Sequence, residues 1–161
     1  MIIKKLTMDD LYAWKALRLD SLQNCPHRFT ASFEEDSKLT DADWVQFFSE
    51  AEHFGVFFEE HLVSIASLSK MRALKTTHRG ILWGVYTAAS FQGRGFAKLL
   101  IQHILNYAKK DLLQIHLQCA QDNSSALRLY QSLGFIEYGL EPRTIKVNDQ
   151  FYDAVLMVIC F

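Results

Sequence analysis

Two glycines flank an arginine in the segment SFQGRGFAKLL, residues 90–100, which follows an apolar run and precedes a helical pattern. Ordering Gly93 and Gly95 on folding costs more backbone entropy than ordering other residues, which suggests that the loop requires glycine at these positions. A helix N-terminus presents unpaired N–H groups and a partial positive charge. The N–H groups from Gln92 to Ala97 can close around an anion, and Arg94 adds a full charge. The segment therefore predicts a phosphate site.

A tight turn that uses its glycines for packing is the alternative interpretation of this loop. Two familiar phosphate motifs do not fit it. The G-x-x-x-x-G-K-[ST] spacing of a P-loop is absent. Lys98 stands where a dinucleotide-binding loop has its third glycine, and no acidic residue ends a strand about 20 residues later. Taken alone, the segment leaves the packing turn and the phosphate cradle open.

A second chemical pattern lies in DNSSALRLYQSLGF, residues 122–135. Asn123, Ala126, Leu127 and Tyr130 recur at helical spacing and so share one helix face. Asn123 can offer an amide to a polar ligand, and Tyr130 places a hydroxyl on an apolar stripe. The alternative makes Asn123 a helix cap and Tyr130 a core aromatic residue with a solvated hydroxyl. Helical periodicity alone favours the alternative.

Both patterns belong to an alternation of strands and helices. The expected order is one strand, two helices, three strands, a helix, a strand, a helix and two strands. A strand–helix–strand unit in the middle should be parallel and right-handed, with antiparallel hairpins on either side. We therefore expect a mixed α/β fold. The expected segments are a strand at 2–6, helices at 7–23 and 36–51, a hairpin at 55–71, a strand at 79–88, a helix from 96 to 108, a strand at 113–120, a helix at 122–135 and a hairpin at 143–161 with a turn at Asn148-Asp149.

Composition limits the classes of protein. The 161 residues fit a single domain spanning 1–161, and a net charge of −1 selects no nucleic acid partner. No apolar run reaches the roughly 18 residues of a membrane span, and the N-terminus lacks the apolar stretch of a signal peptide. Three distant cysteines and six histidines without ligand spacing predict neither a disulfide framework nor a metal site. We expect a cytoplasmic protein that has no membrane partner.

Together the two motifs resemble the GNAT superfamily of acyl-CoA-dependent N-acyltransferases. The family loop [Q/R]-x-x-G-x-[G/A] is met by Gln92, Gly93, Arg94, Gly95, Phe96 and Ala97. The family's second signature is met by Asn123, Ala126, Tyr130, Gly134 and Phe135, about 30 residues later. The closing segment resembles a bacterial subgroup of mostly unassigned substrate. One departure is Ala89, where the family usually carries proline.

The resemblance implies a fold and a set of binding roles. It implies a largely antiparallel sheet of about seven strands around the parallel unit, flanked by about four helices. Acetyl-CoA would be the co-substrate, with no metal. The backbone of Val85, Tyr86 and Thr87 would pair with its pantetheine arm, and the loop from Gln92 to Ala97 would bind its pyrophosphate. Asn123, with Ala126 on the same helix face, would contact the pantetheine.

The resemblance also implies direct transfer to an amine acceptor in a ternary complex. A backbone N–H at the end of the 81–87 strand would stabilise the oxyanion, and Tyr130 would donate a proton to the leaving thiolate. No carboxylate on that strand offers itself as the base. Glu34, Glu35 and Tyr152 are candidates for the acceptor pocket, and a solvated surface position is the alternative for each.

Two other functions compete with an N-acetyltransferase. One is a GNAT-like module that holds acyl-CoA without turnover, against which Tyr130 argues. The other is an unrelated binder of nucleotide phosphates. A sheet edge exposed in the closing hairpin could pair across a homodimer.

Overall fold

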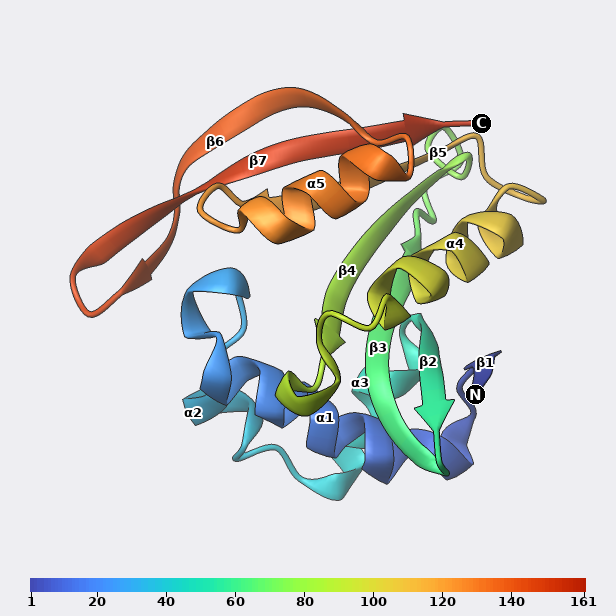
Figure 1. Ribbon diagram of the computed structural model, residues 1–161, viewed down its shortest axis with the longest axis vertical. Helices are drawn as coiled ribbons and strands as arrows, with labels where there is room; N and C mark the ends of the chain where they lie inside the picture. The colour runs from blue at the N-terminus through green and yellow to red at the C-terminus, as the bar shows by residue number, and fades with distance from the viewer.

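A mixed sheet of seven strands forms the frame of the computed structural model, which describes Met1–Phe161 (Figure 1). The strand order is β1-β2-β3-β4-β5-β7-β6, and only the β4–β5 pair is parallel. This confirms the expected mixed fold with a parallel unit at its centre. The strands are β1 Ile2–Lys5, β2 Glu52–Phe58, β3 His61–Lys70, β4 Arg79–Thr87, β5 Gln114–Ala120, β6 Ile136–Val147 and β7 Gln150–Cys160.

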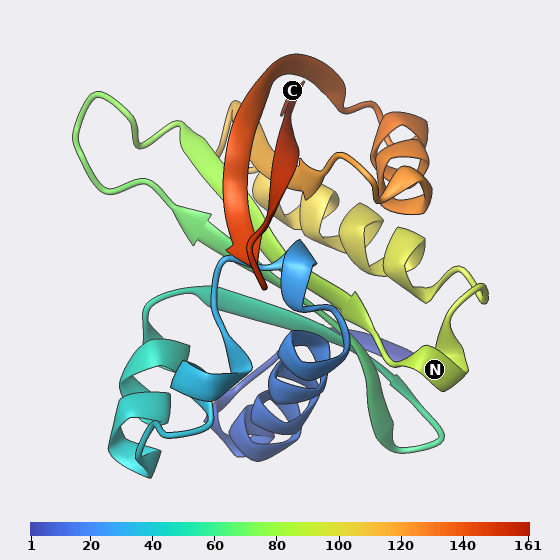
Figure 2. The same cartoon turned by 90° about the vertical axis from the view of Figure 1, so that its left-hand side faces the viewer.

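Helices cover both faces of the sheet (Figures 1 and 2). The helices α4 and α5 lie on one face, and α1, α2 and α3 lie on the other. Their bounds are α1 Leu11–Asn24, α2 Phe33–Asp36, α3 Asp41–Ser49, α4 Phe96–Ala108 and α5 Ser124–Ser132. The short α2 is the one the residue pattern did not reveal. It forms because the Ser32 hydroxyl caps the Glu35 N–H and acidic residues occupy its first turn.

Two apolar clusters hold the layers together. The larger cluster joins α4 to the sheet through residues such as Leu100, Ile104 and Leu68, all fully buried. The smaller cluster packs α1 and α3 against the opposite face, with Trp14 and Trp44 at its centre. The two indole rings meet edge to face at 5.9 Å between centroids, a favoured aromatic geometry. The sheet is thus buried on both faces around β3 and β4.

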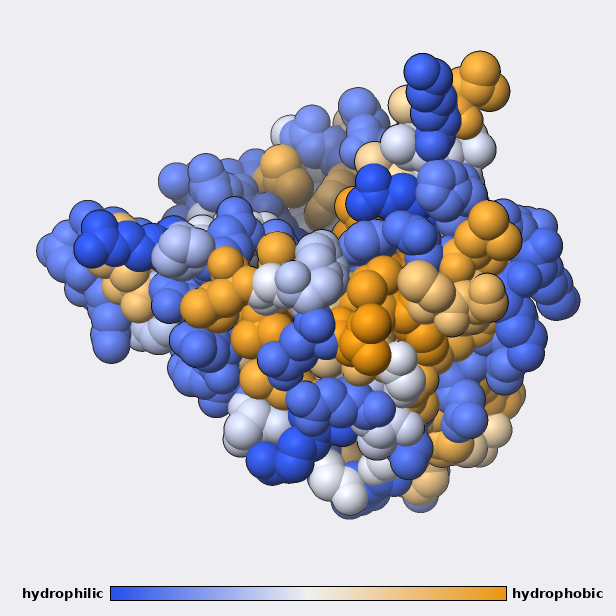
Figure 3. Space-filling model, turned by 90° about the horizontal axis from the view of Figure 1, so that it is seen from above, coloured by the Kyte–Doolittle hydropathy of each residue, from blue (hydrophilic) through white to orange (hydrophobic).

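The closing hairpin is longer than the pattern predicts. The expected turn is confirmed, since Asn148 and Asp149 adopt φ values of 48° and 63°. The strand β6 begins at Ile136 rather than near 143, directly after the helix α5. Because β6 is the last strand in the sheet order, one of its edges has no partner within the chain. Viewed from above, apolar side chains gather among hydrophilic ones on this side (Figure 3), and the expected homodimer stays a prediction.

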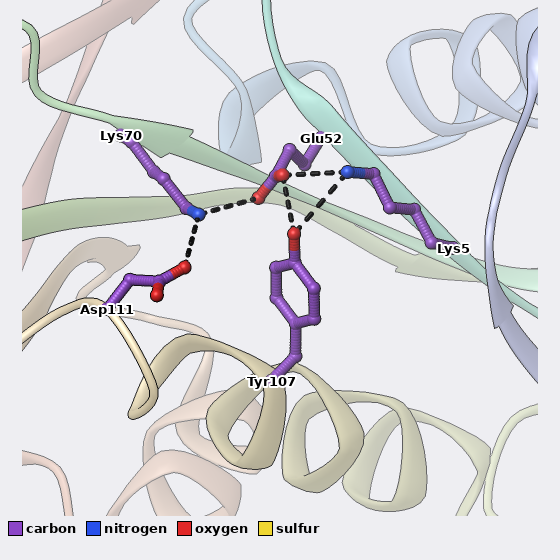
Figure 4. Close-up of polar contacts among 5 residues, drawn as sticks. All are labelled: Lys5, Glu52, Lys70, Tyr107 and Asp111. Carbon is purple, nitrogen blue, oxygen red and sulfur yellow. Dashed lines mark hydrogen bonds and ion pairs between the residues drawn. The ribbon is translucent and has the colours of Figure 1, made fainter.

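A polar cluster ties the ends of four elements together (Figure 4). The Glu52 carboxylate accepts hydrogen bonds from Lys5 Nζ at 2.7 Å and from the Tyr107 hydroxyl at 2.6 Å. Lys70 approaches Glu52 at 3.7 Å and Asp111 at 3.1 Å. Partial burial disfavours the charged Glu52 carboxylate, yet the two hydrogen bonds and the Lys5 and Lys70 charges together outweigh burial and hold its pKa below the usual value. The cluster braces β1, β2 and β3 against α4.

His53 is a buried imidazole inside the smaller cluster. Its Nδ1 lies 2.8 Å from Ser67 Oγ and its Nε2 lies 3.1 Å from the Phe48 carbonyl oxygen. Because a carbonyl only accepts, Nε2 carries the proton and Nδ1 accepts from Ser67. Burial lowers the pKa of His53 to about 4, and the nearby Arg18 charge acts in the same direction.

Because of His53, we expect the free energy of unfolding to decrease as the pH is lowered. Unfolding restores the ordinary pKa of 6.5, so the unfolded chain binds the proton first as the pH drops from 6.5 to about 4. The free energy of unfolding should lose about 3 kcal/mol across this window through His53 alone. Urea unfolding at several pH values measures this slope. In His53→Gln the slope should be flatter, and an unchanged slope would contradict the assignment.

No helix of the structure has the length and apolar character needed to cross a membrane. No group of three or more His, Cys, Asp or Glu side chains is arranged to hold a metal ion.

Candidate functional site

The parallel strands β4 and β5 separate soon after they meet. They pair only from Arg79–Ile81 to Gln114–His116, although β4 continues to Thr87 and β5 to Ala120. Beyond this point β5 pairs only with β7, as far as Ala120 opposite Ala154. Residues 82–87 of β4 therefore have no strand partner on their β5 side. The sheet opens into a gap between its two halves.

A bulge in β4 accompanies this separation. On the β3 side, Ile65 pairs with Tyr86 and Ser67 pairs with Trp83, so β4 has one extra residue between these pairs. Gly84 absorbs the bulge with φ of +63°, a left-handed conformation that side chains disfavour. Bulges bend a strand and increase its twist, which turns the end of β4 away from β5.

The gap forms a cleft of about 1040 Å³ that runs across the sheet. One wall comes from β4 and the loop that leads to α4. The other wall comes from β5, α5 and the β6–β7 hairpin. Most residues of the two sequence motifs line this cleft, whereas Arg94, Leu127, Gly134 and Phe135 do not: the lining ones are Gln92, Gly93, Gly95, Phe96, Ala97, Asn123, Ala126 and Tyr130.

Free N–H groups line the mouth of the cleft at the start of α4. The six consecutive N–H groups from Gly93 to Lys98 donate to no backbone or side-chain acceptor, whereas Leu99 N–H donates to the Gly95 carbonyl. Gly93 and Gly95 adopt φ of +75° and +81°, and nothing lies within 4 Å of where a Cβ would stand on either. The two glycines therefore shape an open concave backbone surface. This is the geometry that binds phosphate at a helix N-terminus.

The remaining loop side chains hold this surface in place. Gln92 N–H bonds the Ala89 carbonyl at 3.4 Å and its side-chain amide donates to the Thr87 carbonyl at 3.0 Å, so Gln92 fastens the loop to β4. Phe96 is buried against Phe58 and Phe91. The exposed Arg94 lies over the Phe91 ring at 5.1 Å, on the outside of the loop. The free N–H run thus starts one residue later than the sequence pattern placed it.

Ala89 starts a short 3-10 turn, Ala89–Phe91, at the position where the resemblance led us to expect proline. Ala88 N–H donates to the Val63 carbonyl and anchors the start of the loop to β3. The loop is therefore held at both ends without the ring of a proline.

Asn123 combines its two expected roles. Its Oδ1 accepts from Ala126 N–H at 3.3 Å and from Ser125 Oγ at 3.1 Å, which caps α5. Because capping uses only the oxygen, the Nδ2 donors stay free for a ligand in the cleft that Asn123 lines. The cap and the ligand contact do not exclude each other.

Tyr130 sits deep on the wall formed by α5. The residue is 7% exposed, its ring packs edge to face on Phe135, and it lines the cleft. Burial raises the pKa of its phenol above the usual value, and the neighbouring Cys119 adds to the rise. The phenol therefore keeps its proton at neutral pH. Burial also raises the pKa of the Cys119 thiol, to about 12.

The outer part of β4 supplies the facing wall. Val85, Tyr86 and Thr87 all line the cleft, although the Tyr86 side chain points to α1, where its hydroxyl donates to Asp20 at 2.7 Å. Backbone groups alternate in direction along a strand, and Ala88 N–H faces β3. The Thr87 backbone groups therefore face the gap, as the bond from Gln92 to the Thr87 carbonyl shows.

The three acceptor-site candidates do not come together. Tyr152 lines the cleft and its ring stacks on His27 at 4.9 Å. Glu34 and Glu35 are exposed on α2 and lie outside the cleft lining. Glu35 is engaged at the helix cap, where Ser32 Oγ donates to it at 2.8 Å.

Two further cleft residues, Arg18 and His116, belong to neither sequence motif. Arg18 on α1 lines the cleft although it is 5% exposed. His116 lies at the point where β4 and β5 part, and its ring contacts Arg79 at 3.4 Å and the Tyr138 hydroxyl at 3.2 Å. A charged residue on the otherwise apolar face of the first helix is the only signal that points to Arg18 beforehand.

Comparison with known families decides the assignment. The model of the acetyltransferase (GNAT) family matches residues 14–135. The chain belongs to the GNAT acetyltransferase family. The matched residues include β4 on one wall of the cleft and β5 and α5 on the other, while the β6–β7 hairpin follows the match. Most residues through which this GNAT chain resembles the family pattern line the gap, and Gly134 and Phe135 are exceptions.

Several curated relatives of this GNAT chain are named as acetyltransferases with different acceptors. A spermidine N(1)-acetyltransferase from Vibrio cholerae is 29% identical over 103 residues, which is 63% of this chain and 58% of that protein. A ribosomal protein bS18-alanine N-acetyltransferase from Salmonella typhimurium is 25% identical over 117 residues, 69% of this chain and 79% of that protein. The matches to three curated relatives span 58%, 36% and 44% of their lengths.

Solved structures share the GNAT fold over nearly the whole chain. An acetyltransferase of the GNAT family from Streptococcus pneumoniae superposes with a TM-score of 0.87 at 20% identity, covering 99% of this chain and 98% of that one. An acetyltransferase from Salmonella typhimurium, solved with its cofactor acetyl-CoA, gives a TM-score of 0.84 at 16% identity, covering 99% and 93%. At these identities the likeness concerns the fold.

Proposed function

We propose that this chain transfers an acetyl group from acetyl-CoA to a primary amine by direct attack within a ternary complex. The observation that carries the proposal is the cleft between β4 and β5, with free N–H groups at its mouth and the Tyr130 phenol on its wall. A pantetheine arm needs a narrow passage with exposed backbone groups, and a pyrophosphate needs a cluster of donors. The chain provides both in one cleft.

The residues divide into binding and chemical roles. The N–H groups from Gly93 to Lys98 bind the pyrophosphate, and the segment Val85, Tyr86 and Thr87 pairs with the pantetheine like an added strand through those backbone groups that face the gap. Asn123 donates its free amide hydrogens to the same arm. Ala126, on the same helix face, leaves room for it.

The transfer step forms one C–N bond and breaks one C–S bond. A backbone N–H near the end of β4 stabilises the oxyanion that develops on the thioester carbonyl. Tyr130 gives its proton to the departing thiolate, and the amine gives up a proton to water in the cleft. Solvent then restores the Tyr130 proton. Acetyl-CoA supplies the activated acyl group, and no step calls for a metal.

Binding and turnover can be measured separately. Thermal unfolding should show stabilisation by acetyl-CoA, about 2.7 kcal/mol at one hundred times its dissociation constant, and none by ATP or NAD at equal concentration. CoA release is then followed with amino acids, peptides, aminoglycosides and polyamines as acceptors. Release above the hydrolysis background with at least one amine supports the enzyme. Tight acetyl-CoA binding without release from any amine would point instead to a binding module.

A further inference from the structure

Arg18 is a buried cation whose hydrogen-bonding capacity is largely unused. The side chain makes no hydrogen bond within the protein, and its Nε is completely buried without a partner. Its one ionic contact is Asp36 Oδ2, at 3.7 Å from Nε, which is beyond hydrogen-bond distance. A guanidinium offers five N–H donors in a rigid fork. Nε faces Asp36, whereas the terminal NH1 and NH2 groups donate to no acceptor in the protein and are available to a ligand.

The surroundings of Arg18 direct its fork toward the cleft. The guanidinium carbon lies over the Phe29 and Trp83 rings, 5.8 Å and 5.6 Å from their centroids, within cation–π distance. Arg18 NH1 lies 3.7 Å from the position where a Cβ would stand on Gly84, at the bulge of β4. Arg18 also belongs to the cleft lining. The free donors therefore sit beside the strand segment where acyl transfer is proposed to take place.

The charges around the cleft favour an anion at this position. Its lining has the cations Arg18, Arg28, Arg79 and Lys98 against two carboxylates, Glu141 and Asp153. Both carboxylates are already engaged. Glu141 accepts from Gln118 at 2.8 Å, and Asp153 accepts from the Arg143 N–H at 2.8 Å. A polyamine without an anionic group would offer no acceptor to the terminal NH1 and NH2 groups of Arg18, whose Nε alone faces Asp36.

We propose that Arg18 binds a carboxylate of the acceptor, so that the acceptor is a primary amine with a carboxylate in the same molecule. This rests on the proposed acyl transfer and narrows its substrate class. The carboxylate accepts a two-pronged, charge-assisted hydrogen bond from NH1 and NH2, the geometry for which arginine is suited. Arg18 thereby holds the acceptor with its amine toward the end of β4.

The test compares acceptors that differ only in the carboxylate. CoA release is measured with the twenty common amino acids, with their α-carboxamides and with spermidine. At least one acid should exceed its own amide in kcat/KM by about ten-fold, the effect of one charge-assisted hydrogen bond. The amides of aspartate and glutamate keep a side-chain carboxylate and so distinguish the two sources of the anion. Acetylation of spermidine or of neutral amides alone would overturn this proposal and leave acyl transfer intact.

Substitutions of Arg18 test whether this residue itself binds the carboxylate. Arg18→Gln should abolish the preference for the acid, so that the ratio of kcat/KM for the acid to kcat/KM for its amide falls to about one, while acetyl-CoA affinity stays close to wild type. An equal loss on acid and amide would show a merely structural role and overturn the proposal, as would a preference that survives.

Two further variants serve as controls for the Arg18→Gln measurement. Removing Arg18 leaves Asp36 buried without its partner, so the double variant Arg18→Gln/Asp36→Asn is measured in parallel. It should lose the same preference. Lys15→Gln removes a cation from the same helix, whose ammonium pairs with Asp41 outside the cleft, and it should keep the preference.

Discussion

Replacing Tyr130 with phenylalanine should lower kcat by about 10²- to 10⁴-fold, the usual contribution of a positioned proton donor, and leave the dissociation constant of acetyl-CoA nearly unchanged. The hydroxyl lines the cleft and has no hydrogen-bond partner in the protein, so it is free to serve a reacting atom. The ring fills the space beside Phe135, and phenylalanine fills it equally well. The substitution therefore removes the proton-donating hydroxyl and leaves the packing of the ring nearly unchanged.

The protonation state of Tyr130 sharpens this prediction. Burial holds the pKa of the phenol above its usual value of 10.0, so the donor form dominates throughout the neutral range. Loss of the Tyr130 proton should not limit the rate below pH 10. A decline in rate between pH 7 and 9 that disappears in Tyr130→Phe would contradict the assigned role.

Tyr107→Phe is the matched control for this change. It also removes a phenolic hydroxyl, but Tyr107 lies outside the cleft lining, where it donates to Glu52 in the cluster of Figure 4. We expect this variant to lose some stability and to keep kcat. Steady-state kinetics of the three proteins, with acetyl-CoA binding measured by calorimetry, separate the two effects. A fully active Tyr130→Phe enzyme would rule out Tyr130 as the acid.

Replacing Gly95 with alanine should weaken acetyl-CoA binding by about one hundred-fold, the loss of roughly two hydrogen bonds to a charged group. Gly95 adopts φ of +81° at the N-terminus of α4. An L-residue in this conformation carries roughly 1–2 kcal/mol of strain. The loop can relieve the strain only by rotating peptide groups, and rotation turns the free N–H groups away from the phosphates. Calorimetric titration with acetyl-CoA and with CoA measures the effect.

Gly134→Ala is the control that has the same kind of strain. Gly134 adopts φ of +97° after the C-terminus of α5, but it does not line the cleft. An added Cβ there meets the Ile159 side chain at 3.4 Å, an ordinary contact distance. This variant should lose stability comparable to Gly95→Ala and keep its affinity for acetyl-CoA. If both variants lost affinity equally, general destabilisation rather than the phosphate surface would explain the result.

Local patterns in the sequence were sufficient to predict much of the fold and the loop and helix that carry the two motifs. The spacing of glycines before a strongly amphipathic helix predicts the loop and α4, and the capped face from Asn123 to Tyr130 predicts α5. These features depend on neighbours within one or two turns. The parallel pairing of β4 and β5 also follows, because a strand–helix–strand unit has one favoured arrangement.

The residues of the proposed acceptor site could be identified only from the tertiary structure. The sequence by itself determined which residues could bind phosphate or donate a proton, because those roles follow from residue type and local spacing. Only the tertiary structure decided that β4 parts from β5 after Ile81, and that Arg18 is buried beside Gly84 while Glu34 and Glu35 stay in solvent. The reason is physical: the bulge, the burial and the unmet hydrogen bonds arise where distant segments pack together, and local spacing does not encode that packing.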